Sequence, residues 1–450
     1  MSHLSVAKFG GTSVANYPAM QSCANIVIAD PNTRVVVLSA SAGVTNLLVA
    51  LANGCEEPER NKLLNEVRQI QENILTELKD DSRVRPKIEA LLANITSLAE
   101  AANLATSLAL TDELISHGEM MSSLIFVEVL RELQIEATWL DVRTIVATNS
   151  HFGKAAPNDE QTRQNCNNLL KPLIERGELV ITQGFIGRDE QGKTTTLGRG
   201  GSDYSAALLA EVLNAQDVLI WTDVAGIYTT DPRIVSNAQR IDTMSFSEAA
   251  EMATFGAKVL HPATLLPAVR SNIPVYVGSS KAPQDGGTWV TRNPQPRPTF
   301  RAIALRRDQT LLTLSSLNML YAQGFLANIF TILAKHKISV DTITTSEVSV
   351  ALTLDKMGSA ASGNSLLSQE LIEELSQFCT VKVDTGLSLV ALIGNELHTA
   401  SGVAKRIFET LDAYNIRMIS YGASTNNICL LADSDKADDI VCLLHKALFE

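Results

Sequence analysis

The chain has 450 residues, 45% of them apolar and 19% charged, the composition of a globular protein large enough for two or three domains. Its formal net charge is -12 and it contains no block of Lys or Arg, which argues against a nucleic-acid-binding surface or an anchor for anionic membranes. It also contains no run of about 18 apolar residues, so no membrane-spanning helix is expected.

The N-terminal stretch MSHLSVAKFGG lacks a charged segment followed by a long apolar core, so the sequence predicts no signal peptide. The six cysteines include no C-x-x-C pair, and the seven histidines include no pair at i, i+4. This scatter predicts a cytoplasmic protein with reduced thiols, without a disulfide framework and without a metal held by its own side chains.

From residue 4 to about 290, short β-rich runs alternate with helical stretches. Buried strands are expected at SVAKF, RVVVLSA, LVITQGFI, VLIWTDV and IPVYVGSS. The alternation predicts an α/β fold, in which helices cover a mostly parallel sheet and ligands bind at the C-terminal ends of the strands. The helical region 57–125 is expected to cover one face of that sheet.

A change of composition marks a domain boundary near residues 281–300, where prolines and glycines are too dense for a helix or a central strand. Beyond it, residues 324–340 resemble residues 402–418, a shift of 78 residues. Each copy predicts a strand, a helix, two strands and a second helix, so the region is two copies of one α+β unit. The second copy ends without a final strand, and we expect residues 300–307 or a partner chain to complete its sheet.

The octapeptide GRDEQGKT, residues 187–194, fits the written pattern of a nucleotide-binding P-loop. In a P-loop, however, a helix begins at the Lys. Here Lys193 is followed by TTTLGRGG, whose β-branched residues and glycines start a helix poorly. We therefore predict a hairpin turn at this position.

Five other turns follow predicted strands. KFGGTS (8–13) suits a phosphate but also a plain tight turn, and SASAGVTN (39–46) suits an anion or a helix cap. GRGGSDYSAA (198–207) places Arg199 where it suits a carboxylate or phosphate, although Ser202 or Asp203 can equally cap a helix.

The last two turns, WTDVAGIYTTDPR (221–233) and FGAKVLHP (255–262), are also consistent with surface turns, a solvated Lys258 and a structural His261. Together the five turns predict one site for an anion-rich nucleotide and a small carboxylated molecule. Phosphoryl transfer needs chiefly positioning and charge neutralisation, which such a site supplies.

KFGGTSV, SASAGVTN, TTTLGRGGSDYSA, WTDVAGIYTTDPR and FGAKVLHP, in this order, resemble the aspartate kinases of the amino acid kinase family. KFGGTSV followed by GRGGSD about 190 residues later is highly specific to that family. The resemblance covers essentially the whole chain, and the repeated C-terminal units resemble ACT domains. TSEVSVALTLD (345–355) and SLNML (316–320) are most similar to the monofunctional, lysine-inhibited type.

The resemblance implies an αβα sandwich over residues 1–295, followed by two ACT-like (ferredoxin-like) units at 296–385 and 386–450, which can share strands. It implies transfer of the ATP γ-phosphoryl group to the β-carboxylate of L-aspartate, giving 4-phospho-L-aspartate and ADP, the first step towards lysine, threonine and methionine. Mg²⁺ would bridge the ATP phosphates. Catalytic roles are implied for Lys8, Asp203 and Lys258.

Substrate-binding roles are implied for Ser39, Thr45, Glu119, Arg199, Gly200, Gly201 and Ser202. Nucleotide-binding roles are implied for Lys8, Phe9, Gly10, Gly11, Thr222, Asp223, Tyr228, Arg233, Lys258 and Val259. Glu119 would pair with the α-ammonium of aspartate and Arg199 with its α-carboxylate. Without the resemblance, the sequence around Glu119 is equally consistent with an exposed carboxylate on a helix.

L-Lysine is implied as an inhibitor, bound between ACT-like units of two subunits in a homodimer or a dimer of dimers. The matching positions are Met319, Ala322, Gly324, Phe325, Leu326, Ser339, Val340, Asp341, Ser346 and Glu347. Asp341 and Glu347 suit an ammonium group. Ala322 stands where the lysine-inhibited type has a hydroxyl residue, so one hydrogen bond to the effector is lost or comes from the backbone.

Three other functions stay open. One is a sister kinase acting on another carboxylate or on a nucleoside monophosphate, although GRGGSD with paired ACT-like units favours aspartate. Another is a catalytically silent amino-acid sensor, against which Lys8, Asp203 and Lys258 together argue. The third, a P-loop NTPase, depends entirely on GRDEQGKT.

Overall fold

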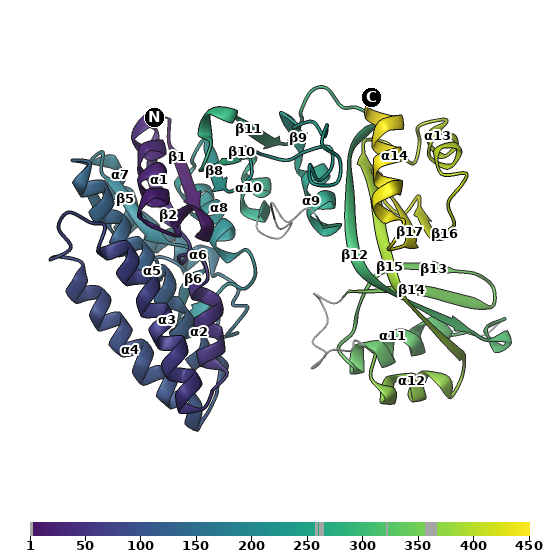
Figure 1. The fold of residues 1–450 in the computed structure, drawn as a ribbon, viewed down its shortest axis with the longest axis horizontal. Coiled ribbons are helices and arrows are strands. Elements are labelled where there is room, and N and C mark those ends of the chain that lie inside the picture. The colour runs from purple at the N-terminus through teal and green to yellow at the C-terminus, as the bar shows by residue number, and fades with distance from the viewer. Residues whose placement is uncertain (1–2, 257–259, 261–264, 321–322, 356–366) are drawn as a thin grey trace. The chain divides into compact units, whose positions relative to one another are not determined.

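The computed structural model describes residues 3–450 apart from 257–259, 261–264, 321–322 and 356–366 (Figure 1). The chain divides into two compact units. The first comprises residues 1–227, 240–249 and 258–295. The second comprises residues 228–239, 250–257 and 296–450.

An eight-stranded sheet forms the centre of the first unit. Its strands are β1 (Ser5–Phe9), β2 (Thr33–Leu38), β3 (Ala137–Trp139), β5 (Leu179–Gln183), β8 (Asp217–Thr222), β9 (Thr243–Ser245), β10 (Val275–Ser279) and β11 (Gly287–Thr291). They lie in the order β3-β5-β2-β1-β8-β10-β11-β9, and every neighbouring pair is parallel except β10 with β11. The predicted α/β fold with a mostly parallel sheet is confirmed.

Helices occupy much of the remaining chain before residue 296. They are α1 (Tyr17–Ala29), α2 (Val44–Ala52), α3 (Glu57–Leu75), α4 (Arg85–Leu104), α5 (Leu108–Glu132), α6 (Asp159–Asn165), α7 (Lys171–Glu175), α8 (Gly201–Leu213), α9 (Phe246–Thr254) and α10 (Leu266–Ser271). Asn16 and Ser107 cap α1 and α5 by accepting a backbone N–H with their side chains, as such residues favour. The helical region predicted at 57–125 corresponds to α3, α4 and most of α5.

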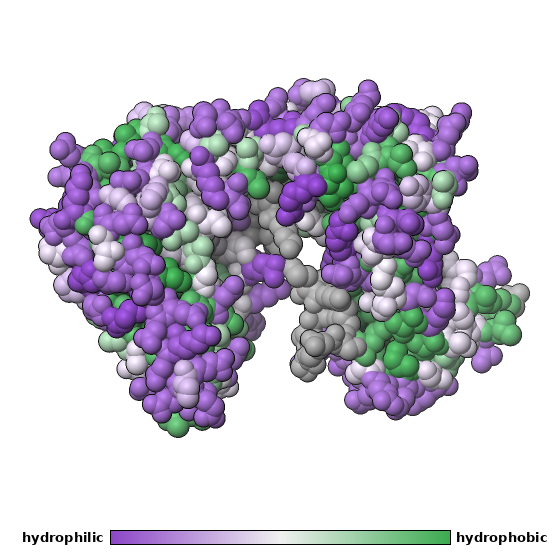
Figure 2. Space-filling model, viewed as in Figure 1, coloured by the Kyte–Doolittle hydropathy of each residue, from purple (hydrophilic) through white to green (hydrophobic). Residues whose placement is uncertain are grey.

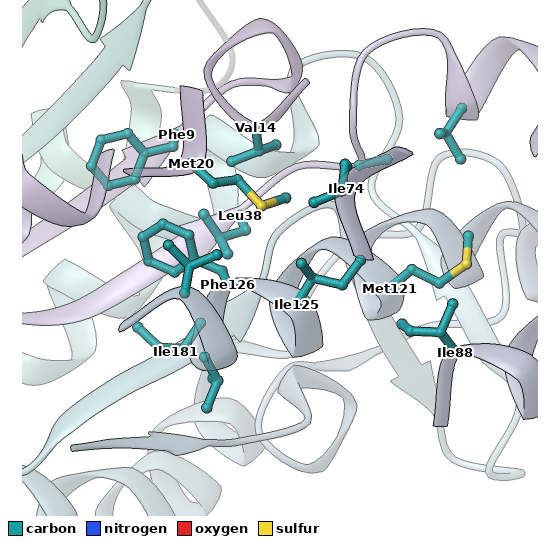
Figure 3. Close-up of a cluster of buried hydrophobic side chains, with 14 of the residues drawn as sticks. Phe9, Val14, Met20, Leu38, Ile74, Ile88, Met121, Ile125, Phe126 and Ile181 are labelled. Carbon is teal, nitrogen blue, oxygen red and sulfur yellow. The ribbon is translucent and has the colours of Figure 1, made fainter. Parts of the chain in front are cut away.

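The main apolar core of the first unit lies between the sheet and helices α1–α5 (Figure 3). Phe9 and Leu38 extend into it from the ends of β1 and β2, and Phe126 from α5 contacts Phe9 with ring centroids 6.2 Å apart. All three side chains are completely buried. This packing fixes the C-terminal ends of β1 and β2, where the predicted site residues begin.

The second unit contains a six-stranded antiparallel sheet. Its elements are β12 (Phe300–Ser315), α11 (Phe325–Lys335), β13 (Ser339–Thr345), β14 (Ser349–Asp355), α12 (Gln369–Ser376), β15 (Thr380–Gly394), α13 (Val403–Thr410), β16 (Ile416–Tyr421), β17 (Asn427–Asp433) and α14 (Ala437–Phe449). The strand order is β13-β14-β12-β15-β17-β16, so the two long strands β12 and β15 run through the middle.

These long strands explain how the incomplete repeat closes. The first half of β12 pairs with the second half of β15, from Ala302 opposite Ile393 to Arg306 opposite Leu389. Residues 300–307 therefore supply the strand that the second copy lacks, within the same chain. Gly324 and Gly402, equivalent in the two copies, both precede a helix with left-handed φ values of 84° and 79°, a conformation that favours glycine.

Two segments from the middle of the chain also belong to the second unit. Residues 228–239 contribute Val235, 6% exposed, to an apolar core that includes Ile303 and Leu444. In residues 250–257, the Glu251 carboxylate accepts hydrogen bonds from Ser424 and Asn427, each at 2.7 Å. The second unit is thus assembled from three separate stretches of sequence.

Charged and polar residues cover most of the face seen in Figure 2, with apolar patches between them. Among the helices that the structure describes, none combines the length and the apolar character needed to cross a membrane. The six cysteines carry free thiols.

The octapeptide 187–194 forms the predicted hairpin rather than a phosphate-binding loop. Strands β6 (Ile186–Asp189) and β7 (Thr194–Thr196) pair antiparallel, and Gly192 takes the left-handed φ of 80° that closes the turn. The buried Asp189 accepts hydrogen bonds from the backbone N–H groups of Gln191 at 3.0 Å and Lys193 at 2.8 Å, and from Ser150 at 2.8 Å. The Lys193 side chain is exposed, so it has no phosphate-binding environment.

We expect Asp189→Ala to lower the free energy of unfolding by about 1–3 kcal/mol, because three hydrogen bonds to a charged acceptor are lost. The control Lys193→Ala removes only an exposed side chain and should stay within about 0.5 kcal/mol of the wild type. Urea unfolding followed by far-ultraviolet circular dichroism measures both. Equal effects of the two substitutions would contradict this account of the turn.

Candidate functional site

Three of the predicted turns meet at one edge of the first unit's sheet because their strands end in register. Phe9 at the end of β1 lies opposite Leu38 of β2 and opposite Trp221 of β8. The turns that follow Phe9, Leu38 and Thr222 therefore leave the sheet side by side. This is the C-terminal edge, where parallel sheets bind their ligands.

The turn after β1 is bound to both neighbouring turns. The N–H of Gly10 donates to the Trp221 carbonyl at 3.1 Å, and the N–H of Ala42 donates to the Gly11 carbonyl at 3.1 Å. A Cβ at Gly11 would lie 2.9 Å from the Ala40 carbonyl oxygen, so only glycine allows this approach. The glycines thus serve to bring three turns together.

Lys8 and Asp203 form an ion pair at this edge. The Lys8 Nζ lies 2.6 Å from the Asp203 Oδ1, and the two side chains are 12% and 13% exposed. Asp203 lies in the first turn of α8, where the helix dipole favours an anion. The two charges are in direct contact and mostly removed from water, so each strongly stabilises the other.

The GRGG turn before α8 has the conformation that its glycines predict. Gly198 and Gly200 take left-handed φ values of 78° and 71°. Arg199 between them is exposed, which leaves its guanidinium available to an anion. Gly201 begins α8 and Ser202 is buried, close against Gly184, whose added Cβ would lie 2.5 Å from the Ser202 Cβ.

The turn after β2 is attached to α5. The Ser39 carbonyl accepts a hydrogen bond from the Ser122 hydroxyl at 2.7 Å, and the Ala40 N–H donates to the Glu119 Oε1 at 3.2 Å. Thr45 lies in the first turn of α2 and is half-buried. Ser39 and Glu119 are therefore brought together by the contacts of α5 with this turn, and Thr45 lies in the helix that follows the turn.

Glu119 is buried, with 3% of its surface exposed. Its Oε2 has no hydrogen-bond partner among the residues that the structure describes. Burial raises the pKa of this carboxyl to about 8, well above the ordinary value for Glu. An unpaired buried carboxyl beside the Ala40 turn has the chemistry to pair with a cation, which would favour its charged form.

The turn after β8 carries two of the predicted nucleotide-binding residues. The Thr222 hydroxyl donates to the Asp223 Oδ1 at 3.2 Å, and the Thr222 carbonyl accepts from the N–H of Ser280 at 2.8 Å. The Ser280 hydroxyl lies 2.6 Å from that of Ser13, which follows the Gly10–Gly11 turn. One serine pair thus connects the β8 turn to the β1 turn.

Tyr228 and Arg233 belong to the second unit. The Arg233 side chain is 90% exposed and its Nη2 lies 2.6 Å from the Asp231 Oδ2. Tyr228 is half-buried. The predicted residues Lys258 and Val259, like His261, lie outside the described residues.

The predicted effector residues lie in the second unit, around the start of α11 and along β13. Met319 lies in a short 3-10 helix (Leu317–Met319), Phe325 and Leu326 begin α11, and the Ser346 hydroxyl lies 2.7 Å from that of Ser349. Ala322 is outside the described residues. Ser339 and Val340 begin β13, and Glu347 follows its end.

Asp341 of β13 already has a cationic neighbour. Its Oδ2 lies 2.9 Å from the Arg306 Nη1, and the two side chains are 11% and 16% exposed. Within the chain, Asp341 is therefore paired with the guanidinium of Arg306, and its binding of an effector's ammonium group stays a prediction. An effector's ammonium would have to share this carboxylate with the guanidinium.

A cavity of about 440 Å³ opens between α1 and strands β1 and β8, with Ala7, Leu219 and Trp221 in its wall. Lys8, Glu119 and Asp203 do not line it, and its wall is mainly apolar. It does not have the chemistry of a phosphoryl-transfer site. Nor do the described residues contain a group of three His, Cys, Asp or Glu side chains able to hold a metal ion.

Known proteins match this chain along its full length. The model of the amino acid kinase family matches residues 3–279, and that of an ACT domain matches residues 390–448. Lysine-sensitive aspartokinase 3 of Escherichia coli is 61% identical over the whole of both chains, and aspartokinase 3 of Arabidopsis thaliana is 35% identical over 99% of this chain and 81% of its own. The chain therefore belongs to the amino acid kinase family and, within it, to the aspartokinases.

Solved structures agree with this assignment. E. coli aspartokinase III in complex with aspartate and ADP (R-state) has a TM-score of 0.89, with 61% identity and full coverage of both chains. The same enzyme in complex with lysine and aspartate (T-state) has a TM-score of 0.88. The predicted family, the predicted fold class and the prediction of a kinase are confirmed.

We expect the stability of the protein to depend on pH through Glu119. Between the pKa of an unfolded Glu, about 4.3, and the folded pKa of about 8, the folded state binds the extra proton. Stability is therefore lost as pH rises through this window, by at most about 1.4 kcal/mol per pH unit. Glu119→Gln should be more stable relative to the wild type at pH 7.5 than at pH 5.5, by about 1–3 kcal/mol.

Urea unfolding of both proteins at the two pH values measures this difference. Glu113→Gln, on the same helix with a half-exposed carboxylate, is the matched control and should leave the wild-type pH dependence unchanged. If Glu119→Gln and the wild type depend on pH equally, Glu119 is ionised in the folded protein.

Proposed function

We propose that the chain transfers the γ-phosphoryl group of ATP to the β-carboxylate of L-aspartate, giving 4-phospho-L-aspartate and ADP. The observation that carries the proposal is the Lys8–Asp203 ion pair at the strand ends, where the glycine turn, the Ala40 turn and the β8 turn meet. The structural relatives support it, because E. coli aspartokinase III was solved with aspartate and ADP.

The attacking group needs no general base. The β-carboxylate of aspartate is ionised at pH 7, since its pKa is about 4. The barrier is instead the approach of one anion to another, and catalysis consists of positioning and charge neutralisation. Lys8 supplies a cation, and Asp203 holds its Nζ in place. Asp203 is a positioning residue in this scheme, and Lys258 is the second proposed cation.

The substrate amino acid is bound at both ends of its backbone. Glu119 accepts the α-ammonium and Arg199 the α-carboxylate, while Ser39 and Thr45 line the same place. Gly200, Gly201 and Ser202 at the start of α8 complete the set. The Gly201 N–H already donates to the Gly198 carbonyl at 3.0 Å, so the backbone donors proposed for the substrate are those of Gly200 and Ser202. An ammonium beside Glu119 favours its ionised form, so aspartate binding displaces the proton that burial retains there.

The nucleotide enters as its Mg²⁺ complex, so the metal is part of the substrate. Mg²⁺ typically keeps several waters and binds substrate phosphates with one or two carboxylates. The backbone of Phe9, Gly10 and Gly11 faces the transferred group. Thr222, Asp223, Tyr228, Arg233 and Val259 are proposed to hold the remainder of the nucleotide.

We expect Lys8→Ala to lower kcat by about 10²–10⁴-fold, since a cation at the transferred phosphoryl is lost. Hydroxylamine trapping of the acyl phosphate, in an assay dependent on ATP and L-aspartate, measures turnover. Lys193→Ala is the matched control and should be fully active. Near-normal turnover of Lys8→Ala would contradict the catalytic role of Lys8. Phosphorylation of an acceptor other than aspartate by the wild type would indicate a sister kinase. A wild type that binds L-lysine but has no kinase activity would indicate an amino-acid sensor.

We further propose that L-lysine inhibits the enzyme by binding to the second unit, around Met319, Gly324, Ser346 and Glu347. The E. coli relative was solved with lysine and aspartate. Leu326, Phe330 and Ile343 are each about two-fifths exposed on α11 and β13, which supports a homo-oligomer formed through this part of the chain. We also propose that the protein is cytoplasmic and that its domains comprise residues 1–295, 296–385 and 386–450.

In initial-rate assays we expect L-lysine, and not L-threonine, to inhibit the wild type. Glu347→Gln should raise the half-inhibitory lysine concentration about tenfold or more, because a charge-assisted hydrogen bond contributes roughly 1.5–3 kcal/mol. Its kcat without lysine should not change. Glu370→Gln, on α12, is the matched control. Inhibition by threonine alone would overturn the choice of effector.

A further inference from the structure

Asp112 is a completely buried carboxylate with no role in the proposed chemistry. It lies near the start of α5, and its two oxygens accept four hydrogen bonds. The N–H of Gly153 lies 3.1 and 2.9 Å from the two oxygens, the N–H of Thr196 lies 2.8 Å from Oδ2, and the Thr196 hydroxyl lies 2.8 Å from Oδ1. Burial raises the pKa of this carboxyl, and the bonds from Gly153 and Thr196 oppose that shift.

The residue held by Asp112 leads directly into the substrate-binding turn. Thr196 is the last residue of β7, and Arg199 follows three positions later. The Thr196 carbonyl accepts the N–H of Ala155 at 2.8 Å, so both peptide groups of Thr196 are fixed. The Asp112 carboxylate thereby holds both the loop around Gly153 and the residue that leads into the GRGG turn.

Helix α5 carries the other end of the substrate site as well. Glu119 lies seven residues after Asp112, which is two helical turns and a rise of about 10 Å along the same face. From there α5 holds the Ala40 turn through Glu119 and the Ser39 carbonyl through Ser122. One rigid helix therefore connects the residue proposed for the α-ammonium with the turn proposed for the α-carboxylate.

We propose that Asp112 is a positioning residue for the amino-acid substrate, which sets the place of Arg199 relative to Glu119 through its bonds to Thr196. The inference depends on the proposed function, because it assigns Arg199 and Glu119 to the two ends of L-aspartate. Asp112 suits this role because a carboxylate can accept from two N–H groups and a hydroxyl at once. An amide in its place would turn an NH₂ group towards one of these donors.

The variant Asp112→Asn tests the proposal in steady-state assays of the full-length enzyme. We expect KM for L-aspartate to rise about tenfold, with KM for ATP within twofold and kcat at saturating aspartate within threefold of the wild type. The proposal is overturned if both KM values rise and kcat falls by similar factors, or if none of the three constants changes.

The pair Thr196→Val and Thr196→Ser provides a second, milder test. Valine keeps the shape and the N–H of Thr196 but removes the hydroxyl that donates to Asp112, whereas serine retains it. KM for L-aspartate should rise about threefold in Thr196→Val and stay unchanged in Thr196→Ser. Because these changes are small, they answer the question even if Asp112→Asn does not fold, and equal KM values for the two variants overturn the proposal.

Combining Asp112→Asn with Arg199→Ala distinguishes a role of Asp112 in positioning Arg199 from a role in general structural support. In an Arg199→Ala background, Asp112→Asn should change KM for L-aspartate by less than twofold, because the residue it positions is gone. An undiminished tenfold effect in that background overturns the proposal. The wild-type assay is made first: an enzyme without aspartate kinase activity refutes the proposed function, whereas an active enzyme without this pattern refutes only the role of Asp112.

Discussion

The approach of a carboxylate to a triphosphate requires cations held where water is scarce, and the Lys8–Asp203 pair meets that requirement. At 2.6 Å and largely buried, the pair is stable only because both residues arrive at the same edge on rigid elements. Lys8 is carried by a central strand and Asp203 by the first turn of α8. Removing Asp203 would leave an ammonium without its partner, and removing Lys8 would leave a buried carboxylate.

The arrangement of the turns around this pair follows from sterics as much as from charge. Gly11 allows the β1 turn to contact the Ala40 carbonyl, and Gly118 of α5 leaves space for the Ala40 side chain, which an added Cβ would meet at 2.7 Å. The same close approach brings Glu119 into contact with the turn and removes it from water. Close backbone packing and the raised pKa of Glu119 therefore have one cause.

The sequence allowed the sheet, the hairpin and the repeat to be predicted, because these depend on local pattern. SVAKF predicts β1 correctly to the residue, and TTTLGRGG correctly excludes a P-loop helix after Lys193. The missing strand of the second repeat could be narrowed to two sources, and the pairing of β12 with β15 selects residues 300–307.

Burial of single polar residues could not be predicted in the same way. Glu119 and Asp112 lie on a helix whose sequence, TDELISHGEMMSS, reads equally well with either residue in solvent. Only the tertiary contacts with the Ala40 turn and with Thr196 distinguish these possibilities. The one local signal was Gly118, since glycine within a helix often marks a close backbone approach.

The segment 228–239 has a consequence for the order in which the protein can form. Thr229 is buried against β12, where the N–H of Ile303 donates to its carbonyl, and its hydroxyl lies 2.9 Å from the Nε2 of His445 in α14. These two residues are separated by 216 positions. At a synthesis rate of about 5–20 residues per second, the segment leaves the ribosome roughly 10–40 s before its partner in α14. The buried contact between Thr229 and His445 therefore cannot form until α14 has been synthesised, although the contact of Thr229 with Ile303 can form earlier.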